Sequence, residues 1–485
     1  MTQAKAMQGL ASRRVAVEVL LKVEQNEAFA NNALSAAFKQ HSLSERDRSF
    51  VTYIVQGTLR HQSELDDELS KLSKKAIPKL SPPLRAVLRS ALFQLIHMKD
   101  MPPSAVINIA VEISRKTGHE GQAKFTNGVL RSFLRSLSPS ETDPGRSAGG
   151  SPASTAATNE ATNKITSLCK KYSLPEWIVE RWSARFDEAE CSKLFEHTQK
   201  IPLLTLRTSE ESISTEGLLK IFESKGMVVE QSKLLPCCLN IIDRGPFSGP
   251  VSKLPGYDDG LFCVQDDASA LVSKVVDPQP GQTIVDLCAA PGGKSVQLGE
   301  MMQNKGRVVA VDSSAKRLSL LGTERRRLGL QNIETVVMDG REFKIEPECD
   351  AVLIDAPCSG TGVLNRRSDL RQNRKEDDLA ALVKIQQELL ENAASLVKPG
   401  GTLVYSTCSI EPEENVENLK QFQEKHPNFK AESLERFFTK ETLESWQQQA
   451  HWAETSRQLS EGYIQLLPSR HGCSGFFICR LKRES

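Results

Sequence analysis

Large apolar residues recur at helical spacing through the first part of the chain. Val15 and Val19 are four residues apart, and residues 84–95 repeat this spacing. Pro82 stands where the second of these helices would begin, a position that tolerates proline because the missing N–H would be unpaired anyway. Since no β-rich run interrupts the pattern, we expect an all-α bundle over residues 1–137.

The pattern changes after this bundle. Residues 138–164 consist largely of Ser, Thr, Ala, Gly and Pro, and such a stretch cannot bury enough apolar surface to offset its ordering entropy, so it predicts a flexible linker. Residues 165–260 are mixed. Short strands at Leu203–Leu206 and Leu239–Ile242, with a helix at Leu218–Phe222 between them, predict a small α/β subdomain.

Strand-like and helix-like stretches alternate from residue 261 to residue 485. Such alternation predicts a mostly parallel sheet covered by helices on both faces. The expected strands are Thr283–Leu287, Arg307–Val311, Ile333–Met338, Ala351–Ile354 and Thr402–Tyr405. Helices are expected at Ala315–Leu328 and Asp378–Leu396, and an antiparallel hairpin at Tyr463–Leu467 and Gly475–Cys479.

Length and cysteine content narrow the class of protein. A chain of 485 residues is too long for one core, and about 150 residues per domain suggests three domains. No apolar run approaches the roughly 18 residues of a membrane span and no secretory signal precedes the bundle, so we expect no membrane association. The eleven cysteines are an odd number without any C-x-x-C pair, which favours reduced thiols in the cytoplasm and no metal site.

Charge is distributed unevenly along the chain. The net charge is +1, but residues 1–137 contain 20 Lys and Arg against 12 Asp and Glu. This excess is typical of a module that faces RNA or DNA, although a solvated helical surface can produce the same count. Charge alone leaves both interpretations of the bundle open.

Two cysteines stand just past the ends of expected strands. Ile354 leads into Asp355-Ala356-Pro357-Cys358-Ser359-Gly360, and Tyr405 leads into Ser406-Thr407-Cys408-Ser409. In a parallel sheet, ligands bind and chemistry takes place at the carboxyl ends of the strands. One such cysteine would be interpreted as a small buried apolar side chain. Two in matching positions favour covalent catalysis, with one thiol as nucleophile and the other as acid or base.

Carboxylates are expected along the same edge of the sheet. Four of the expected strands lead into an aspartate: Asp286, Asp312, Asp339 and Asp355. Any one of them alone would be taken for a helix cap or a turn residue. Four together are costly unless a cationic or hydroxyl-rich ligand binds against them.

A glycine-rich loop follows the first of these strands. It consists of Cys288, Ala289, Ala290, Pro291, Gly292, Gly293 and Lys294. Glycines at the start of a helix let backbone amides approach an anionic group. Asp312 ends the second strand, where dinucleotide folds hold ribose hydroxyls. A ligand with a ribose diol, a carboxylate, a positive centre and no phosphate fits these features, and S-adenosylmethionine is such a ligand.

The same loop differs from a phosphate-binding P-loop, G-x-x-x-x-G-K-[ST], only at its first glycine, which is Cys288 here. A nucleotide hydrolase is therefore an alternative. However, a side chain hinders the turn made by that glycine, and Asp286 and Asp339 would repel a triphosphate. This alternative also leaves Cys358 and Cys408 without a role.

Taken together, these motifs resemble a known family. Asp355–Gly362 and Ser406–Ser409, behind the loop Cys288–Lys294, resemble the RNA cytosine-C5 methyltransferases of the Sun/Fmu superfamily. Leu88–Ala91 and Ile109–Glu112 in the bundle resemble the RNA-binding fold of the antitermination factor NusB. This fusion is typical of bacterial enzymes that methylate small-subunit (16S) ribosomal RNA. The resemblance implies a NusB-like RNA-binding bundle over residues 1–137, a small α/β subdomain over residues 165–260 that also binds RNA, and a Rossmann-like class I methyltransferase domain with a mostly parallel, seven-stranded sheet.

The resemblance also implies a role for each matching residue. Cys408 would be the nucleophile and Cys358 the base that releases the product. S-adenosylmethionine would be bound by Cys288, Ala289, Ala290, Pro291, Gly292, Gly293, Lys294, Asp312, Asp339 and Asp355. The substrate would be 16S ribosomal RNA, naked or early in assembly, and we expect a monomer.

Two segments depart from the residues usual in this superfamily. Leu206-Arg207-Thr208-Ser209 stands where relatives tend to have Leu-Arg-Val-Asn, and Asn365-Arg366-Arg367-Ser368-Asp369 stands in place of an Arg-Arg-His-Pro-Asp-like run. We expect both segments to touch RNA. The target could therefore also be a cytosine in transfer RNA or large-subunit ribosomal RNA. A second alternative is that the protein is a non-catalytic RNA-binding factor. The two thiols argue against the second.

Overall fold

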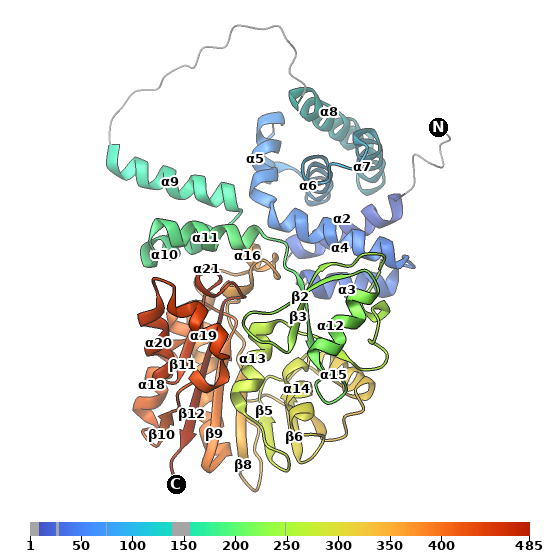
Figure 1. Cartoon of the computed structure of the whole chain (residues 1–485). Coiled ribbons are helices and arrows are strands. Elements are labelled where there is room, and N and C mark those ends of the chain that lie inside the picture. Colours follow the sequence, from blue (N-terminus) through green and yellow to red (C-terminus); the bar gives the residue numbers. More distant parts are fainter. Residues whose placement is uncertain (1–8, 26–28, 74, 138–155, 248) are drawn as a thin grey trace. The chain divides into compact units, whose positions relative to one another are not determined.

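The structure is a computed structural model that describes residues 9–25, 29–73, 75–137, 156–247 and 249–485 (Figure 1). The chain divides into two compact units. Unit 1 comprises Met1–Lys200 and Leu364–Arg374, and unit 2 comprises Ile201–Val363 and Lys375–Ser485. Within the described ranges, no helix is both long and apolar enough to cross a membrane.

Unit 1 is all-helical, as the periodicity predicted. Its first part consists of α2 (Leu10–Glu24), α3 (Ala30–Gln40), α4 (Glu45–Arg60), α5 (Gln62–Leu72), α6 (Pro82–His97), α7 (Pro103–Thr117) and α8 (Glu120–Leu137). Val15 and Val19 of α2 and Leu88 and Leu92 of α6 are buried in the core of this bundle. Pro82 occupies the first turn of α6, where no N–H is needed.

Three more helices complete unit 1: α9 (Ala156–Tyr172), α10 (Glu176–Arg185) and α11 (Glu188–Gln199). Residues 156–164, which we expected to belong to a flexible linker, are therefore the start of α9, while residues 138–155 lie outside the described part. The helices α10 and α11 group with the bundle rather than with the strands that follow them.

A small antiparallel sheet opens unit 2. Its strand order is β2-β3-β1-β4, from β1 (Leu204–Thr208), β2 (Val228–Gln231), β3 (Cys238–Asp243) and β4 (Phe262–Val264), with α12 (Thr215–Ser224) packed against it. The edge strand β4 lies beyond residue 260, where we had placed the end of this subdomain. Only three residues long, it gave too short a pattern to recognise.

The main sheet of unit 2 has a parallel centre. The strands β9 (Val397–Thr407), β8 (Cys349–Asp355), β5 (Thr283–Asp286), β6 (Arg307–Asp312) and β7 (Ile333–Val337) lie side by side in that order and are all parallel. The strands are joined by α14 (Gly293–Met301), α15 (Ala315–Arg327) and α17 (Asp378–Leu396), and α13 (Asp267–Val276) precedes the first of them. This confirms the predicted α/β architecture.

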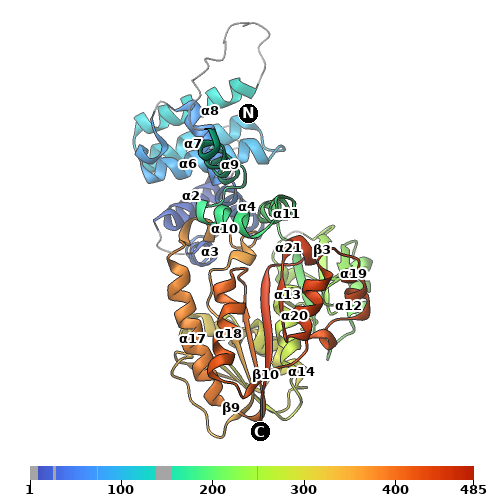
Figure 2. The ribbon, with the colours of Figure 1, turned by 90° about the vertical axis from the view of Figure 1, so that its left-hand side faces the viewer.

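Helices cover both faces of this sheet, because alternate residues of each strand point to opposite sides. Ile284 packs in one core with residues of α13 and α14, whereas its neighbour Val285 packs in another with residues of α17 and α18 (Val416–Lys425). Figure 2 shows α17 and α18 on one side of the sheet and α13 and α14 on the other. Both strand faces are therefore apolar.

Antiparallel strands extend the sheet beyond β9. The strand β12 (Phe476–Arg483) pairs with β9 along one side, and with β11 (Tyr463–Leu466) and β10 (Phe429–Ala431) along the other. The pairing of β11 with β12 confirms the predicted closing hairpin. Seven strands follow one another in order, and β11 pairs with β12 off this path as the eighth. The remaining short helices are α16 (Leu370–Asn373), α19 (Lys440–Gln447), α20 (Trp452–Ser460) and α21 (Pro468–His471).

Candidate active site

The two predicted thiols meet at the carboxyl ends of neighbouring strands. β8 and β9 are parallel, with Asp355 opposite Ser406. Cys358 and Cys408 follow shortly after these two residues, and their Sγ atoms lie 3.1 Å apart. Both side chains are partly exposed. The thiols are therefore a contacting pair on one edge of the sheet.

Close backbone packing fixes the segments that carry the thiols. The N–H of Gly362 donates to the carbonyl of Cys408 at 3.0 Å, and the N–H of Gly475 donates to the carbonyl of Gly362 at 2.9 Å. A Cβ atom on Gly362 would lie 2.1 Å from the carbonyl oxygen of Gly475. Only glycine permits this approach, so the chain after β8, the chain after β9 and the chain before β12 are held together.

The surroundings of Cys358 shift its pKa. The hydrogen bond to Cys408 and burial together raise the pKa of Cys358 well above that of an ordinary thiol. At neutral pH Cys358 therefore keeps its proton and can donate it toward the sulfur of Cys408. A thiol that holds a proton beside a second sulfur is the arrangement expected of an acid or base next to a nucleophile.

The structure also places the four aspartates along one edge. Asp355, Asp286 and Asp312 are the last residues of β8, β5 and β6, and Asp339 lies just beyond the end of β7. Because these strands are parallel and adjacent, their carboxyl ends lie in a row. The edge is thus acidic over four neighbouring strands.

Asp355 is nearest in sequence to the thiols and is firmly held. Lys294 donates to its Oδ2 at 2.7 Å, and the hydroxyl of Ser406 donates to its Oδ1 at 3.1 Å. Lys294 is buried and also donates to the hydroxyl of Ser269 at 2.9 Å, while its ammonium lies 5.6 Å from the ring centre of Phe476. The last residue of the glycine-rich loop is thereby tied to the strand that leads to Cys358.

Asp312 organises the middle of the same loop. Its Oδ2 accepts the N–H of Ala290 at 3.1 Å, and its Oδ1 accepts the N–H of Ser314 at 2.8 Å. The N–H of Ala289 donates to the carbonyl of Val311 at 2.9 Å. The loop therefore lies against the end of β6, and each oxygen of Asp312 still has a lone pair for a hydroxyl group.

The loop needs glycine where it enters α14. Gly292 has φ 113°, and a Cβ atom there would lie 2.6 Å from the side chain of Leu321. Pro291 is exposed beside it, and Gly293 is the first residue of α14. Burial, followed by the nearby carboxylates, raises the pKa of Cys288 well above the ordinary thiol value. Cys288 is thus a neutral thiol that shapes the loop.

Asp339 is the most exposed part of the acidic edge. The guanidinium of Arg341 binds both of its carboxylate oxygens, with Nη2 donating to Oδ2 at 2.7 Å, and this lowers the pKa of Asp339. The carboxylate is therefore ionised, and a ligand that reaches it shares it with Arg341.

One buried oxygen provides a test of whether this edge suits S-adenosylmethionine. Asp286 is 1% exposed, and its Oδ2 accepts the hydroxyl of Ser295 at 2.6 Å. Its Oδ1 is buried and accepts no hydrogen bond from the described residues. Burial raises the pKa of Asp286 to about 7. A carboxylate with one oxygen that lacks a donor, just before a loop rich in glycine, suits a ligand that carries both an ammonium group and hydroxyl groups.

The segment around Arg207 does not face RNA as we expected. Arg207, Thr208 and Ser209 are 3%, 1% and 2% exposed. The guanidinium of Arg207 is bound by Glu300 at 2.6 Å and by Gln265 at 2.7 Å. The expectation was wrong because this segment is the end of the central strand β1, where an internal ion pair takes up the cation.

The second departing segment is also largely internal, within unit 1. Asn365, Ser368 and Asp369 are 4%, 0% and 0% exposed, and the N–H of Ala30 donates to Asp369 at 3.3 Å. Nearby, the buried guanidinium of Arg371 donates to backbone carbonyls, including that of Tyr172 at 2.8 Å. These residues pack unit 1 and offer RNA little surface. The expectation was wrong for them because the sequence does not reveal where an inserted loop docks.

Several residues near the thiols gave no recognisable signal in the sequence. Ser269 and Phe476 come from distant segments and approach Lys294 only in the folded chain. Ser295 could have been found, since it directly follows the loop and can reach back to Asp286. Glu414, a buried carboxylate, was also missed, because in sequence it stands within an exposed-looking acidic run, Glu411–Glu414.

One group of possible metal ligands occurs among the described residues, in unit 1. His61 and His97 contact the same oxygen of Glu64 at 2.9 and 3.2 Å, and their rings stack with centres 4.0 Å apart. Hydrogen bonds from the two histidines lower the pKa of Glu64 to about 2. The three side chains satisfy one another as a hydrogen-bonded triad.

Three family models match the chain. Residues 273–482 match the 16S rRNA methyltransferase RsmB/F model, residues 10–135 match the NusB family, and residues 174–248 match the ferredoxin-like domain of RsmF/B-like methyltransferases. Together these matches cover parts of both units.

Whole proteins are similar over nearly the full length. The probable ribosomal RNA small subunit methyltransferase B of Bacillus subtilis is 33% identical over 477 residues, which is 97% of this chain and 98% of the relative. The crystal structure of PH0851 covers 97% of this chain and 99% of its own, with a TM-score of 0.75 and 28% identity. The crystal structure of a methyltransferase homologue from Pyrococcus horikoshii covers 66% of this chain and 99% of its own, with a TM-score of 0.54 and 26% identity.

Similarity at this level over the whole chain, together with the matching models, removes the nucleotide-hydrolase alternative. The fold, the acidic edge and the glycine-rich loop agree with the methyl donor S-adenosylmethionine. The chain belongs to the ribosomal RNA small subunit methyltransferase B family, with an N-terminal NusB domain and an S-adenosylmethionine-dependent methyltransferase domain.

Proposed function

We propose that this protein methylates C5 of a cytosine in 16S ribosomal RNA, by way of a covalent bond between Cys408 and C6 of the base. The observation that carries the proposal is the pair of thiols, 3.1 Å apart, at the ends of two parallel strands beside the acidic edge. A non-catalytic RNA-binding protein would have no use for this pair.

The reaction requires a nucleophile other than the base itself. C5 of cytosine is too weak a nucleophile to accept a methyl group unaided. Addition of the Cys408 thiolate to C6 makes C5 enamine-like, so that C5 can attack a methyl group. Loss of the C5 proton and of the thiolate then restores the aromatic ring. Cys408 thus forms one bond and later breaks it, which is covalent catalysis.

Cys358 is suited to the second half of this sequence. Its pKa is raised first of all by the hydrogen bond with Cys408. Once the sulfur of Cys408 is bonded to C6 it carries no negative charge, so the pKa of Cys358 falls, while burial and the charges of Glu414 and Asp355 still raise it. We propose that Cys358 then loses its proton to solvent. The resulting thiolate can remove the proton from C5. The two thiols would therefore act in order, Cys408 first and Cys358 second.

When bound, S-adenosylmethionine supplies the methyl group. We propose that the loop Cys288–Lys294 and the acidic edge hold it, with Asp312 accepting hydroxyl groups and Asp286 accepting an ammonium group. Asp339 lies at the exposed end of the same edge. Lys294 keeps Asp355 oriented near the thiols, where its carboxylate can also meet the polar edge of a cytosine.

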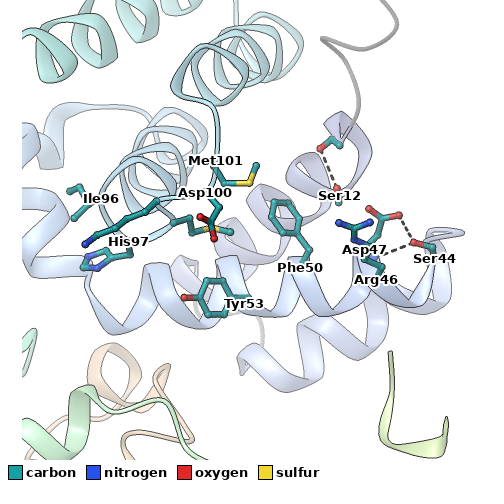
Figure 3. A pocket seen from close by; sticks show the side chains of 13 residues that line it. Ser12, Ser44, Arg46, Asp47, Phe50, Tyr53, Ile96, His97, Asp100 and Met101 are labelled. Carbon is teal, nitrogen blue, oxygen red and sulfur yellow. Dashed lines mark hydrogen bonds between the residues drawn. The ribbon is translucent and has the colours of Figure 1, made fainter. Parts of the chain in front are cut away.

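RNA binding by unit 1 is supported by a cavity of about 1050 Å³. Phe50 and Tyr53 of α4 line it (Figure 3). Tyr53 is 40% exposed. The charges that line the cavity balance, with Arg46 and Lys99 against Asp47 and Asp100. Aromatic rings stack on unpaired bases, so the two rings are what suits this cavity to a single-stranded segment of RNA. The target base must also leave its stack to reach the thiols, which is easiest in such a segment.

The direct test is methylation of 16S ribosomal RNA by the purified full-length chain. We expect 5-methylcytidine in the digested RNA when naked 16S RNA and S-adenosylmethionine are present without other proteins. We also propose that the enzyme acts as a monomer and in the cytoplasm. C408A should abolish it, whereas C169A, which changes a cysteine of unit 1, should not. Methylation of transfer RNA or large-subunit RNA instead would contradict the choice of substrate, and activity in C408A would contradict the mechanism.

A further inference from the structure

A buried carboxylate lies behind the two thiols. Glu414 is the last residue of a short 3-10 helix, Pro412–Glu414, in the chain that follows Cys408. It is 0% exposed. A charge is costly in such a place unless hydrogen-bond donors surround it, and nothing in the reaction described above uses it.

Two of the three hydrogen bonds to Glu414 come from Ser359, in the segment that carries the other thiol, and the third comes from α17. The N–H of Ser359 donates to Oε1 at 2.8 Å, and the hydroxyl of Ser359 donates to Oε2. Gln386 of α17 donates to Oε1 at 2.9 Å. Since Ser359 directly follows Cys358, this carboxylate ties the chain after β9 to the chain after β8.

The same connections hold Cys358 from its other side. The amide of Gln386 also donates to the carbonyl of Pro357 at 2.9 Å, and Asn418 donates to the side-chain oxygen of Gln386 at 2.8 Å. Both neighbours of Cys358 are therefore anchored to one buried network. The hydroxyl of Ser359 lies 3.0 Å from that of Ser409, which follows Cys408, so the network includes the neighbours of both thiols.

We infer that Glu414 is a positioning residue, which holds the segment Pro357–Ser359 so that the Cys358 thiol faces Cys408 and, later, C5 of the base. This inference rests on the roles proposed above for the two thiols. It predicts that loss of the carboxylate impairs the step that needs Cys358 more than the step that needs Cys408.

A carboxylate is required here because its two oxygens accept three hydrogen bonds. In Glu414→Gln the remaining oxygen can still accept from the N–H of Ser359 and from Gln386, but the new NH₂ group faces the hydroxyl of Ser359, which must turn and accept instead of donating. The charge-assisted hydrogen bond from Ser359 is thereby lost, and its loss loosens the segment. A misplacement of about 1 Å in a catalytic group can slow a step by about 100-fold.

The experiment uses the full-length chain, 16S RNA and S-adenosylmethionine, and follows two quantities in a single turnover. One is the covalent protein–RNA adduct on a denaturing gel, and the other is released 5-methylcytidine. In E414Q we expect adduct to form at nearly the wild-type rate but to be released about 10-fold to 100-fold more slowly. E300Q is the matched control, because Glu300 is also buried in unit 2 but is paired with Arg207. It should lower stability without accumulating adduct.

A second readout separates positioning from general loss of structure. After the hydrogen bond to Cys408 and burial, the negative charge of Glu414 is a further cause that raises the pKa of Cys358. In a C408A background, E414Q should therefore lower the pH midpoint at which Cys358 is alkylated, as followed by mass spectrometry of its peptide. A variant that merely loosened the fold would expose many cysteines at once.

The outcomes distinguish this inference from the proposed function. If C358A accumulates adduct but E414Q releases product at the wild-type rate with an unchanged alkylation midpoint, Glu414 has no positioning role. If C358A itself forms no adduct, the roles of the thiols are wrong. Should E414Q fail to fold, S359A keeps the charge and removes one of its hydrogen bonds. S359A should then show a smaller delay in release, and normal release would refute the inference.

Discussion

Asp286→Asn is expected to change the stability of unit 2 in a manner that depends on pH. Asp286 is buried at the end of β5, and only its Oδ2 has a donor, the hydroxyl of Ser295. Asparagine has nearly the same shape and retains an oxygen for Ser295, but it cannot ionise. The comparison therefore isolates the cost of a buried charge from the cost of a changed shape.

The magnitude follows from the pKa. Burial raises the pKa of Asp286 from 3.8 to about 7. Below pH 3.8 both the native and the unfolded state hold the proton. Between pH 3.8 and about 7 only the native state holds it, so native stability falls as the pH rises, by about 1.4 kcal/mol per unit. From pH 5 to pH 7 the loss is about 3 kcal/mol, and above pH 7 it stays constant. D286N does not lose this stability, because asparagine does not ionise.

The assay is urea unfolding of the full-length wild-type chain and of D286N at pH 5 and pH 8, without ligand. Hydrogen exchange in peptides from β5 and β6 reports on unit 2 alone. The quantity to compare is the unfolding free energy of D286N minus that of the wild type. This difference should be about 3 kcal/mol larger at pH 8 than at pH 5. An equal difference in unfolding free energy at both pH values would refute the argument that burial, with only one hydrogen-bond donor, raises the pKa of Asp286.

Three further predictions concern the neighbourhood of the thiols. Gly362→Ala should abolish methylation and destabilise unit 2 by about 2 kcal/mol or more, because its Cβ would meet the carbonyl of Gly475; an unchanged melting temperature would contradict the close approach. Mild peroxide should link Cys358 and Cys408, whose sulfurs are 3.1 Å apart, and inactivate the enzyme until a dithiol is added; peptide mapping that finds both thiols free after inactivation would argue otherwise. Lys294→Met should weaken binding of S-adenosylmethionine, by about 10-fold, since it removes the buried cation that holds the partly exposed Asp355; calorimetry that shows wild-type affinity would exclude this role.

The architecture of the chain could largely be predicted from its apolar pattern. The helix Asp378–Leu396 was predicted to the residue, and the five parallel strands were found within a few residues of their ends. Most of these elements are long or buried, so their periodicity is clear, and β7, a mostly exposed edge strand, was found from its run of β-branched residues. In contrast β4, with three residues, and the start of α9 at Ala156, in a stretch of small polar residues, carry too few apolar positions to give a period.

That the candidate site residues lie together could be predicted because they follow strand ends. Cys358, Cys408 and the aspartates were identified from their positions after apolar runs, and parallel pairing brings such positions to one edge. What the sequence did not reveal are contacts made across the fold. The ion pair of Arg207 with Glu300 and the network around Glu414 join residues that are far apart along the chain. No local pattern encodes such partners.

The most direct measurement of the central claim is the identity of the amino acid that is joined to the RNA. C358A should trap the covalent complex with 16S RNA and S-adenosylmethionine, and nuclease and protease digestion would then leave a nucleotide on one peptide. We expect mass spectrometry to find 5-methylcytidine monophosphate attached to Cys408. A nucleotide on any other residue, or a complete absence of adduct from an active wild-type preparation, would contradict covalent catalysis by this thiol.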